Sequence, residues 1–393
     1  MKPNVNEALE LIKKNITPLE PETVGIDEAD GRRAAENVTA LADYPPFSRS
    51  PYDGYAIRSC DAAMGELFSV IGDSFAGAPF EGKIEKMQAV KIMTGGMIPE
   101  GADCVVPWEN SDRGEKKVKI YVSPEPFENY IRQGEDFKRG ETLLKAGTEI
   151  SAAEIALAAA GGIDKIKIYR RLRAAIISTG DELTPPGKTL EKGKIYDTNI
   201  LYVSLRLREL GESIVYKKAV RDDIEALRTS VLEASKKADI IFTTGGVSVG
   251  EKDLMPDALE KAGARNVFKG VNIKPGMPTT FSILEGRPVI ALSGNPFAAA
   301  VGFELFGREA LAALSGDRAL YPRRAAAVMA NEYSKKSGTE RYLKASCADG
   351  LVSVPDSQGN GSLRSMTGCN CLIRIPAGTE CLKAGDRVEV LYV

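Results

Sequence analysis

The chain contains no histidine among its 393 residues. Without histidine, neither a Ser-His-Asp nor a Cys-His catalytic arrangement can form, and no metal can be bound through imidazole. A general base must then be a carboxylate, a lysine or a bound water molecule. A hard metal must be held by oxygen ligands, which favours Mg²⁺ over a structural zinc ion.

Long apolar runs, basic clusters and paired cysteines are also absent. No stretch has the length of a transmembrane helix, and the N-terminus lacks the apolar core of a signal peptide. The 52 basic and 54 acidic residues give a net charge of −2, so we expect no nucleic-acid partner. The six cysteines are scattered without a CxxC pair. We interpret them as small buried side chains in a reducing cytoplasm, and we expect no membrane partner.

The pattern of the chain changes several times along its length, and 393 residues predict two to four domains. Short alternating apolar runs with many glycines indicate strands, whereas spacings of three and four indicate helices. We therefore predict a multidomain α/β plus β protein. Its predicted parts are an N-terminal and linker α/β domain at 1–43 and 141–171, a small mostly β domain at 44–140, a doubly wound α/β domain at 172–320 and a C-terminal β-barrel at 321–393.

Strands and helices alternate in the third of these parts, which predicts right-handed βαβ units and a mostly parallel sheet. The expected strands are 174–177, 213–216, 240–244 and 288–292, and the expected helices are 199–210, 224–238 and 297–314. Each strand is followed by a polar turn. Ligands of such sheets bind beyond the carboxyl ends of the strands, so the turns are expected to form one site.

The turn after residues 240–244 is the most informative one, because it is rich in glycine. Gly245, Gly246 and Gly250 lack a Cβ, so their backbone N–H groups can point at one phosphate. Ser248 adds a hydroxyl donor, and Asp253 would attract a divalent cation to the phosphate. A tight strand-to-helix connection is the alternative, since one such loop is a weak signal.

Three acidic residues follow three of the strands: Glu182, Asp222 and Asp253. Each alone could be a helix cap or a solvated turn residue. Three carboxylates at one sheet edge repel each other unless a cation compensates them. The set therefore predicts a Mg²⁺ site.

Two further turns are candidates for anion binding. Lys274 and Pro275 form a rigid turn that presents a cation, which either contacts an oxyanion or is solvated. The run Ser293, Gly294, Asn295 and Pro296 begins a predicted helix, where free N–H groups bind an anion or are simply capped.

Motifs in the order of the chain resemble those of the molybdopterin molybdenumtransferase family, which includes bacterial enzymes and the carboxyl-terminal domain of gephyrin. Two of them, around Asp53 and Thr94, are explained locally by hairpin turns. The matching segments cover most of the chain. They are 45–56, 92–109, 134–144, 177–183, 245–253, 274–278 and 292–299.

The resemblance implies a homodimer of four-domain subunits in which the 172–320 domain is like the molybdopterin-binding sheet proteins. The active cleft is expected between this domain and domains of the partner subunit, which would bring Asp53 and Thr94 into the catalytic site. A molybdopterin adenylyltransferase is a further possible partner.

The resemblance also implies the reaction, in which molybdate is inserted into adenylylated molybdopterin and AMP is released. The glycine turn would hold the pterin phosphate, and Asp222 and Asp253, with Glu182, would place Mg²⁺ on the pyrophosphate. Lys274, Ser365 and a basic residue of the last domain would bind the molybdate dianion. The other expected substrate-binding residues are Pro275, Ser293, Gly294, Asn295, Pro296, Arg341, Lys344 and Ser362.

Two positions depart from the family pattern in the expected anion site. Met277 replaces a frequent lysine, and Lys344 stands where an arginine is common, although Arg341 is close. These changes fit two alternatives, an enzyme that prefers tungstate or a carrier of molybdopterin. A non-catalytic dimeric scaffold of the gephyrin type is a separate alternative. The acidic residues Asp53, Glu182, Asp222 and Asp253 favour the enzyme.

Overall fold

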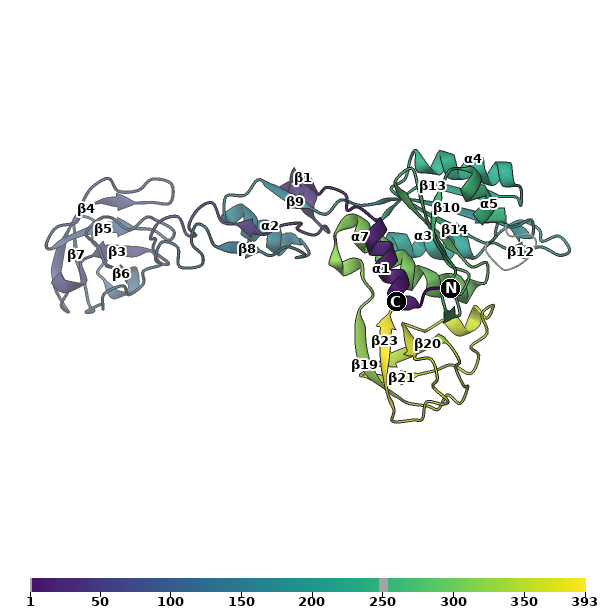
Figure 1. The fold of residues 1–393 in the computed structure, drawn as a ribbon. Helices are drawn as coiled ribbons and strands as arrows, with labels where there is room; N and C mark the ends of the chain where they lie inside the picture. The colour runs from purple at the N-terminus through teal and green to yellow at the C-terminus, as the bar shows by residue number, and fades with distance from the viewer. Residues whose placement is uncertain (1, 247–253) are drawn as a thin grey trace. The chain divides into compact units, whose positions relative to one another are not determined.

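A computed structural model describes residues 2–246 and 254–393, and the chain forms two compact units. One unit contains residues 1–22 and 169–393, and the other contains residues 23–168. Figure 1 shows the elements of both units. Within the described residues, every helix is too short or too polar to cross a membrane.

The 23–168 unit is mostly β, as the sequence predicts for residues 44–140. Its main sheet has the strand order β6-β3-β5-β4-β7. These strands are Cys104–Pro107, Gly54–Ile57, Gln88–Ile92, Leu67–Ser74 and Lys117–Lys119. The rest of the unit contains two two-stranded sheets and helix α2, with β1 at Glu22–Gly25, β9 at Lys165–Ile168, β2 at Val38–Thr39, β8 at Thr142–Leu144 and α2 at Ala152–Ala160. Ser151 and Glu154 form the capping box at the start of α2 that their spacing predicts.

A six-stranded sheet with the order β13-β10-β14-β18-β17-β15 is the centre of the other unit. The strands are Ser213–Val220, Arg173–Thr179, Ile240–Thr244, Arg287–Leu292, Thr280–Leu284 and Arg265–Lys269. The first four are parallel, as predicted, and three of them, β10, β14 and β18, are buried almost throughout, as is typical of parallel strands. The last two are antiparallel and were not predicted from the sequence.

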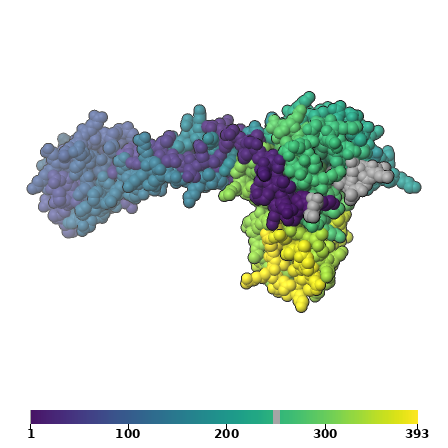
Figure 2. All heavy atoms as spheres, in the orientation of Figure 1, coloured from purple at the N-terminus to yellow at the C-terminus, as the bar shows by residue number. Residues whose placement is uncertain are grey.

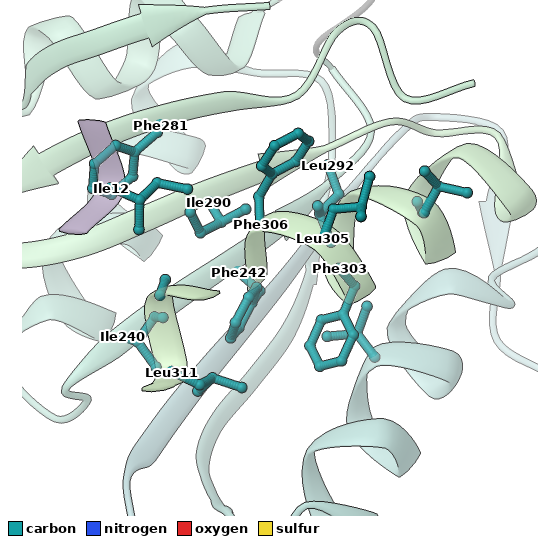
Figure 3. Close-up of a cluster of buried hydrophobic side chains, with 14 of the residues drawn as sticks. Ile12, Ile240, Phe242, Phe281, Ile290, Leu292, Phe303, Leu305, Phe306 and Leu311 are labelled. Carbon is teal, nitrogen blue, oxygen red and sulfur yellow. The ribbon is translucent and has the colours of Figure 1, made fainter. Parts of the chain in front are cut away.

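Helices cover both faces of this sheet. The first face packs against α1, α3, α6 at Pro296–Gly302 and α7 at Arg308–Ser315, and the second packs against α4 and α5. Four of these helices are α1 at Val5–Asn15, α3 at Asn199–Glu209, α4 at Ile224–Ser235 and α5 at Leu254–Lys261. Figure 3 shows Ile12 of α1 in the same apolar cluster as Phe242, Phe303 and Phe306. The N-terminal helix, purple in Figure 2, therefore completes the core of a domain that begins more than 150 residues later.

The single helix predicted over 297–314 is wrong in one respect. The structure has α6 at Pro296–Gly302, a π-helical segment at Phe303–Gly307 and α7 at Arg308–Ser315. Such wider turns inside an α-helix change which residues face the core. Here the wider turn contains the buried Glu304, which accepts hydrogen bonds from Arg206 and Arg308.

The C-terminal strands close into a barrel, as predicted. The order is β20-β21-β19-β23-β22, and β22 pairs back with β20. Their bounds are Glu340–Ala348, Leu351–Ser353, Arg324–Met329, Arg387–Tyr392 and Cys371–Ile375. Tyr342, Leu372 and Leu391 join the core of the sheet domain, so the barrel and the sheet share one apolar cluster.

The cysteines are less uniformly buried than the sequence interpretation expects. Cys104, Cys347 and Cys371 are buried, whereas Cys60 and Cys381 are exposed.

Candidate functional site

The turns after β10, β13, β14 and β18 lie at the same edge of the sheet, because these four strands are parallel neighbours. Hydrogen bonds connect the turns. The hydroxyl of Thr179 donates to Asp222 Oδ1 over 2.7 Å, and the N–H of Gly245 donates to the carbonyl of Leu292 over 3.2 Å. Segments 40 and more residues apart in sequence thus form one polar edge.

The glycine turn begins directly after β14, where Gly245 lies against Thr179 at the end of β10. Gly245 and Gly246 have φ values of 86° and 62°, which favour glycine. A Cβ on Gly245 would lie 2.2 Å from the carbonyl oxygen of Thr179, which no side chain permits. The candidates Ser248, Gly250 and Asp253 lie outside the described residues.

Asp222 is half-buried and held by neutral donors. Its Oδ1 accepts from Thr179, and its Oδ2 accepts from the N–H of Asp181 over 3.4 Å. In return, the N–H of Asp222 donates to Asp181 Oδ1 over 3.3 Å. Glu182 is the next residue on the same turn and is exposed. The structure therefore brings two of the predicted acids to one place.

Asp181 is a functional candidate that sequence reasoning missed. Its position directly before Glu182, in the same turn, is the signal in the sequence that points to it. Within residues 2–246 and 254–393, no group of three or more acidic or cysteine side chains is arranged to hold a metal ion. Carboxylate oxygens facing solvent are nevertheless ligands that suit Mg²⁺, so the donors present fit this ion.

A cavity of about 650 Å³ opens beside the acidic turn. Its wall contains Asp181 together with the cations Lys188, Lys194 and Arg221. The ammonium of Lys194 donates to the carbonyl oxygen of Asp181 over 2.5 Å. Acidic and basic groups in one wall suit a ligand that is anionic and also carries a cation.

The turn after β18 is fixed by a residue from another helix. Asn199, in the first turn of α3, donates its amide to the carbonyl oxygen of Gly294 over 2.7 Å. The Ser293 hydroxyl accepts from the N–H of Asn295 over 3.2 Å, and Pro296 begins α6. Asn199 was also missed, because nothing in its local sequence shows which turn lies opposite.

The expected anion-binding residues fall into two groups. The exposed Lys274 lies in β16, Ile273–Lys274, which pairs in parallel with β20 and places Lys274 opposite Arg341. The Arg341 guanidinium donates to the hydroxyls of Ser337 and Tyr333, each over 3.2 Å.

The second group surrounds Lys344, which is only 1% exposed. Its ammonium donates to the carbonyl oxygens of Gly359 and Ser362, each over 3.1 Å. The Ser365 hydroxyl lies 3.0 Å from the same Ser362 carbonyl oxygen and 2.9 Å from the Ser362 hydroxyl, and its one hydrogen can be donated to either. Lys344, Ser362 and Ser365 therefore form one connected network.

Asp53 and Thr94 are bonded to each other in the 23–168 unit. The N–H and the hydroxyl of Thr94 donate to Asp53 Oδ1 over 2.7 and 2.8 Å. These bonds, that of the backbone first, lower the pKa of the Asp53 carboxyl. The following Gly54 is required, because a Cβ there would lie 2.1 Å from the carbonyl oxygen of Val106.

Three family models match nearly the whole chain. They are described as "MoeA N-terminal region (domain I and II)" at residues 3–162, "Probable molybdopterin binding domain" at 175–313 and "MoeA C-terminal region (domain IV)" at 326–393.

Curated relatives and solved structures are similar over the full length. Proteins named molybdopterin molybdenumtransferase from Staphylococcus epidermidis and Staphylococcus aureus are 35% and 33% identical, over 99% and 98% of this chain and 95% and 94% of theirs. A crystal structure of a molybdopterin biosynthesis MoeA protein from Pyrococcus horikoshii has a TM-score of 0.88 at 30% identity, covering 100% of this chain and 99% of that one. A second structure of a MoeA protein from that organism has a TM-score of 0.78 at 28% identity, with both chains fully covered.

Proposed function

This chain belongs to the molybdopterin molybdenumtransferase family. We propose which of its residues bind each part of the substrates. The protein is a transferase of molybdenum cofactor biosynthesis, and molybdopterin is its substrate class. The proposed reaction is the insertion of molybdate into adenylylated molybdopterin, with release of AMP. The observation that carries this proposal is the polar sheet edge, where Asp222 and the Asp181–Glu182 turn meet beside Gly245.

The sheet edge would bind the diphosphate half of the substrate. The backbone at Gly245 and Gly246, with Ser248 and Gly250, would hold the pterin phosphate, and the turn from Ser293 to Pro296 would offer further N–H groups. Asp222, Glu182 and Asp253 would hold Mg²⁺, which when bound would neutralise charge as the phosphoanhydride breaks. Thr179 and the N–H of Asp181 orient Asp222 for this role.

The barrel side would bind the molybdate dianion. Lys274 is exposed and lies opposite Arg341 in paired strands, so two cations are close together there. Pro275 restricts the turn that presents Lys274. Ser365 and Ser362 would add hydroxyl donors. The sulfur ligands of the metal come from the substrate, which is consistent with the dispersed cysteines of the chain.

A second copy of the chain would complete the site, in a cytoplasmic homodimer. The partner's small β domain would then supply the pair of Asp53 and Thr94. The lowered pKa of Asp53 favours its ionised form, so this carboxylate would offer a negative charge to a cation and would be a weak proton acceptor. A molybdopterin adenylyltransferase is the proposed source of the adenylylated substrate.

The direct test combines purified protein, adenylylated molybdopterin, molybdate and Mg²⁺. The expected products are AMP and a cofactor that reconstitutes a molybdenum enzyme, and chelation of Mg²⁺ should stop both. Intact substrate with no AMP release would contradict the proposal. Tungstate in place of molybdate measures metal preference.

Replacing Asp253, the third predicted metal ligand, tests whether the sheet edge is the reaction site. The Asp253→Ala variant should lose turnover while its thermal midpoint stays near that of the parent protein. Equal losses of stability and activity would contradict the site role. A scaffold or a carrier of molybdopterin would tolerate the loss of this carboxylate.

A further inference from the structure

Residue 344 is the anchor of a loop, through both its backbone and its side chain. The Gln358 amide accepts from the N–H of Lys344 over 3.2 Å and donates to its carbonyl oxygen over 3.1 Å. The Lys344 ammonium then binds two carbonyl oxygens further along the loop, those of Gly359 and Ser362. Residues 358–362 are thus tied to one position of strand β20.

The same loop is tied to the helix that starts at the sheet edge. The N–H of Phe297, in the first turn of α6, donates to the carbonyl oxygen of Asn360 over 3.0 Å. The ring of Phe297 lies 4.7 Å from the Lys344 ammonium, measured from its centroid. A cation over an aromatic face is attracted by it, most strongly when desolvated. Lys344 therefore connects the barrel strand, the loop and α6.

The positive charge of Lys344 is stabilised by neutral groups of the protein. No carboxylate of the described residues forms an ion pair with it, and burial lowers the pKa of its ammonium group. Two carbonyl oxygens and an aromatic ring take the place of a counter-ion. A buried charge with these partners has few donors left for a ligand.

The cavity beside Lys344 does not suit a molybdate dianion. It has a volume of about 370 Å³, and its wall includes the apolar side chains of Leu363, Met366 and Leu372. The wall also contains Glu304 and Arg206, which form an ion pair over 2.7 Å, so the Arg206 guanidinium is already bound within the protein. Lys274, in contrast, is exposed and lies opposite Arg341 in the paired strands.

We infer that Lys344 is a positioning residue: it fixes the loop that carries Ser362 and Ser365, and it does not itself bind the oxyanion. Lysine suits this position because its compact ammonium can satisfy two carbonyl oxygens and an aromatic face, whereas the guanidinium of arginine is a planar fork. The functional half of the inference, that Lys344 supports molybdate binding through the loop, rests on the proposed binding of molybdate by Ser365. The structural half, that Lys344 holds the loop in place, concerns the free protein alone.

The structural half is tested by hydrogen exchange in the absence of molybdate and pterin. The Lys344→Met and Gln358→Leu variants should each raise amide exchange at residues 358–365 by about tenfold or more, because each removes bonds that hold the loop. Lys274→Ala should leave exchange in this loop unchanged. Unchanged exchange of the loop in a folded Lys344→Met variant would overturn the inference. Gln358→Leu decides the matter if Lys344→Met fails to fold.

The functional half is tested by the apparent affinity for molybdate. Lys344→Met, Gln358→Leu and Lys274→Ala should each raise the half-saturating molybdate concentration by about tenfold. The KM for adenylylated molybdopterin should stay within about a factor of two, since only the oxyanion contacts change. The exposed Lys336, which pairs with Glu380 in the same barrel, provides the matched control Lys336→Ala, for which no change is expected.

A double-mutant cycle separates positioning from direct binding. If Lys344 acts through the serines, Lys344→Met should add little to the loss of molybdate affinity already caused by Ser365→Ala. The fold-losses of affinity caused by Lys274→Ala and Ser365→Ala should instead multiply in the double variant. Multiplying losses for Lys344 and Ser365 would show a direct contact and overturn the inference. Calorimetric titration with molybdate gives these affinities without turnover. Failure of AMP release would therefore refute the proposed function and leave the anchoring role to be decided separately.

Discussion

Charged side chains gather in two regions: the carboxyl edge of the sheet, and the junction between the sheet domain and the barrel, around Glu304. The partners of these charges differ between the two regions. At the sheet edge, Asp222 is partly exposed, and from the described part of the chain its carboxylate accepts one hydroxyl and one N–H, so its negative charge is available to a ligand. At the junction, Glu304 is 1% exposed and bonded to Arg206 and Arg308. Charge balanced inside the protein supports structure, and charge held by neutral donors is left for function.

The largest expected effect breaks the junction. In Glu304→Ala, two arginines lose their shared carboxylate in a buried setting, so the free energy of unfolding should fall by about 3–5 kcal/mol. Urea denaturation measures this change. The control Glu380→Ala removes a carboxylate that is 77% exposed and should cost less than about 1 kcal/mol. Similar losses in the two variants would contradict the distinction.

The second largest expected effect concerns the rate of AMP release and not the stability of the fold. Asp222→Asn keeps the shape of the side chain but removes its charge, and the rate of AMP release should fall by about 100-fold or more. The neighbouring Asp223 is the matched control, because it caps α4 by accepting from the N–H of Ala226 over 2.7 Å. Asp223→Asn should retain activity. If both variants lose activity equally, the sheet edge is not the reaction site.

The smallest effect extends the comparison to the 23–168 unit, where Asp53 is again held by neutral donors. Because its pKa is lowered from an ordinary value of 3.8, its ionised form stabilises the fold above that pH. This stabilisation is lost as the pH falls through the lowered pKa. Thr94→Val removes the hydroxyl donor, so the titration midpoint of the Asp53 carboxyl should rise, as measured by ¹³C NMR. An unchanged midpoint would show that the hydroxyl does not contribute.

Local patterns predicted the elements well where a single segment contained the whole signal. The capping box of Ser151 and Glu154 and the strand Ile240–Thr244 are examples. The π-helical segment was not predicted, because one wider turn hardly changes the apolar spacing of residues 297–314. The antiparallel strands β15 and β17 were missed for a related reason, since their pairing partners lie in other segments.

The sequence also predicted which turns meet at the sheet edge, because parallel strands place their carboxyl ends on one side. It could not distinguish Lys274 from Lys344. Both are lysines near predicted anion-binding turns, and their difference in burial depends on the loop 358–362 and on Phe297. Such contacts between distant segments exist only in the folded chain.

The sequence by itself determined the alternation of helices with the four parallel strands, the absence of histidine chemistry and the acidic and glycine-rich turns, since these depend on residue type and short-range spacing. Only the tertiary structure decided that Asp181 pairs with Asp222, that Asn199 holds the Gly294 turn and that Lys344 is buried. The physical reason is that burial and hydrogen-bond partners are set by packing between segments far apart in the chain, which no local pattern contains.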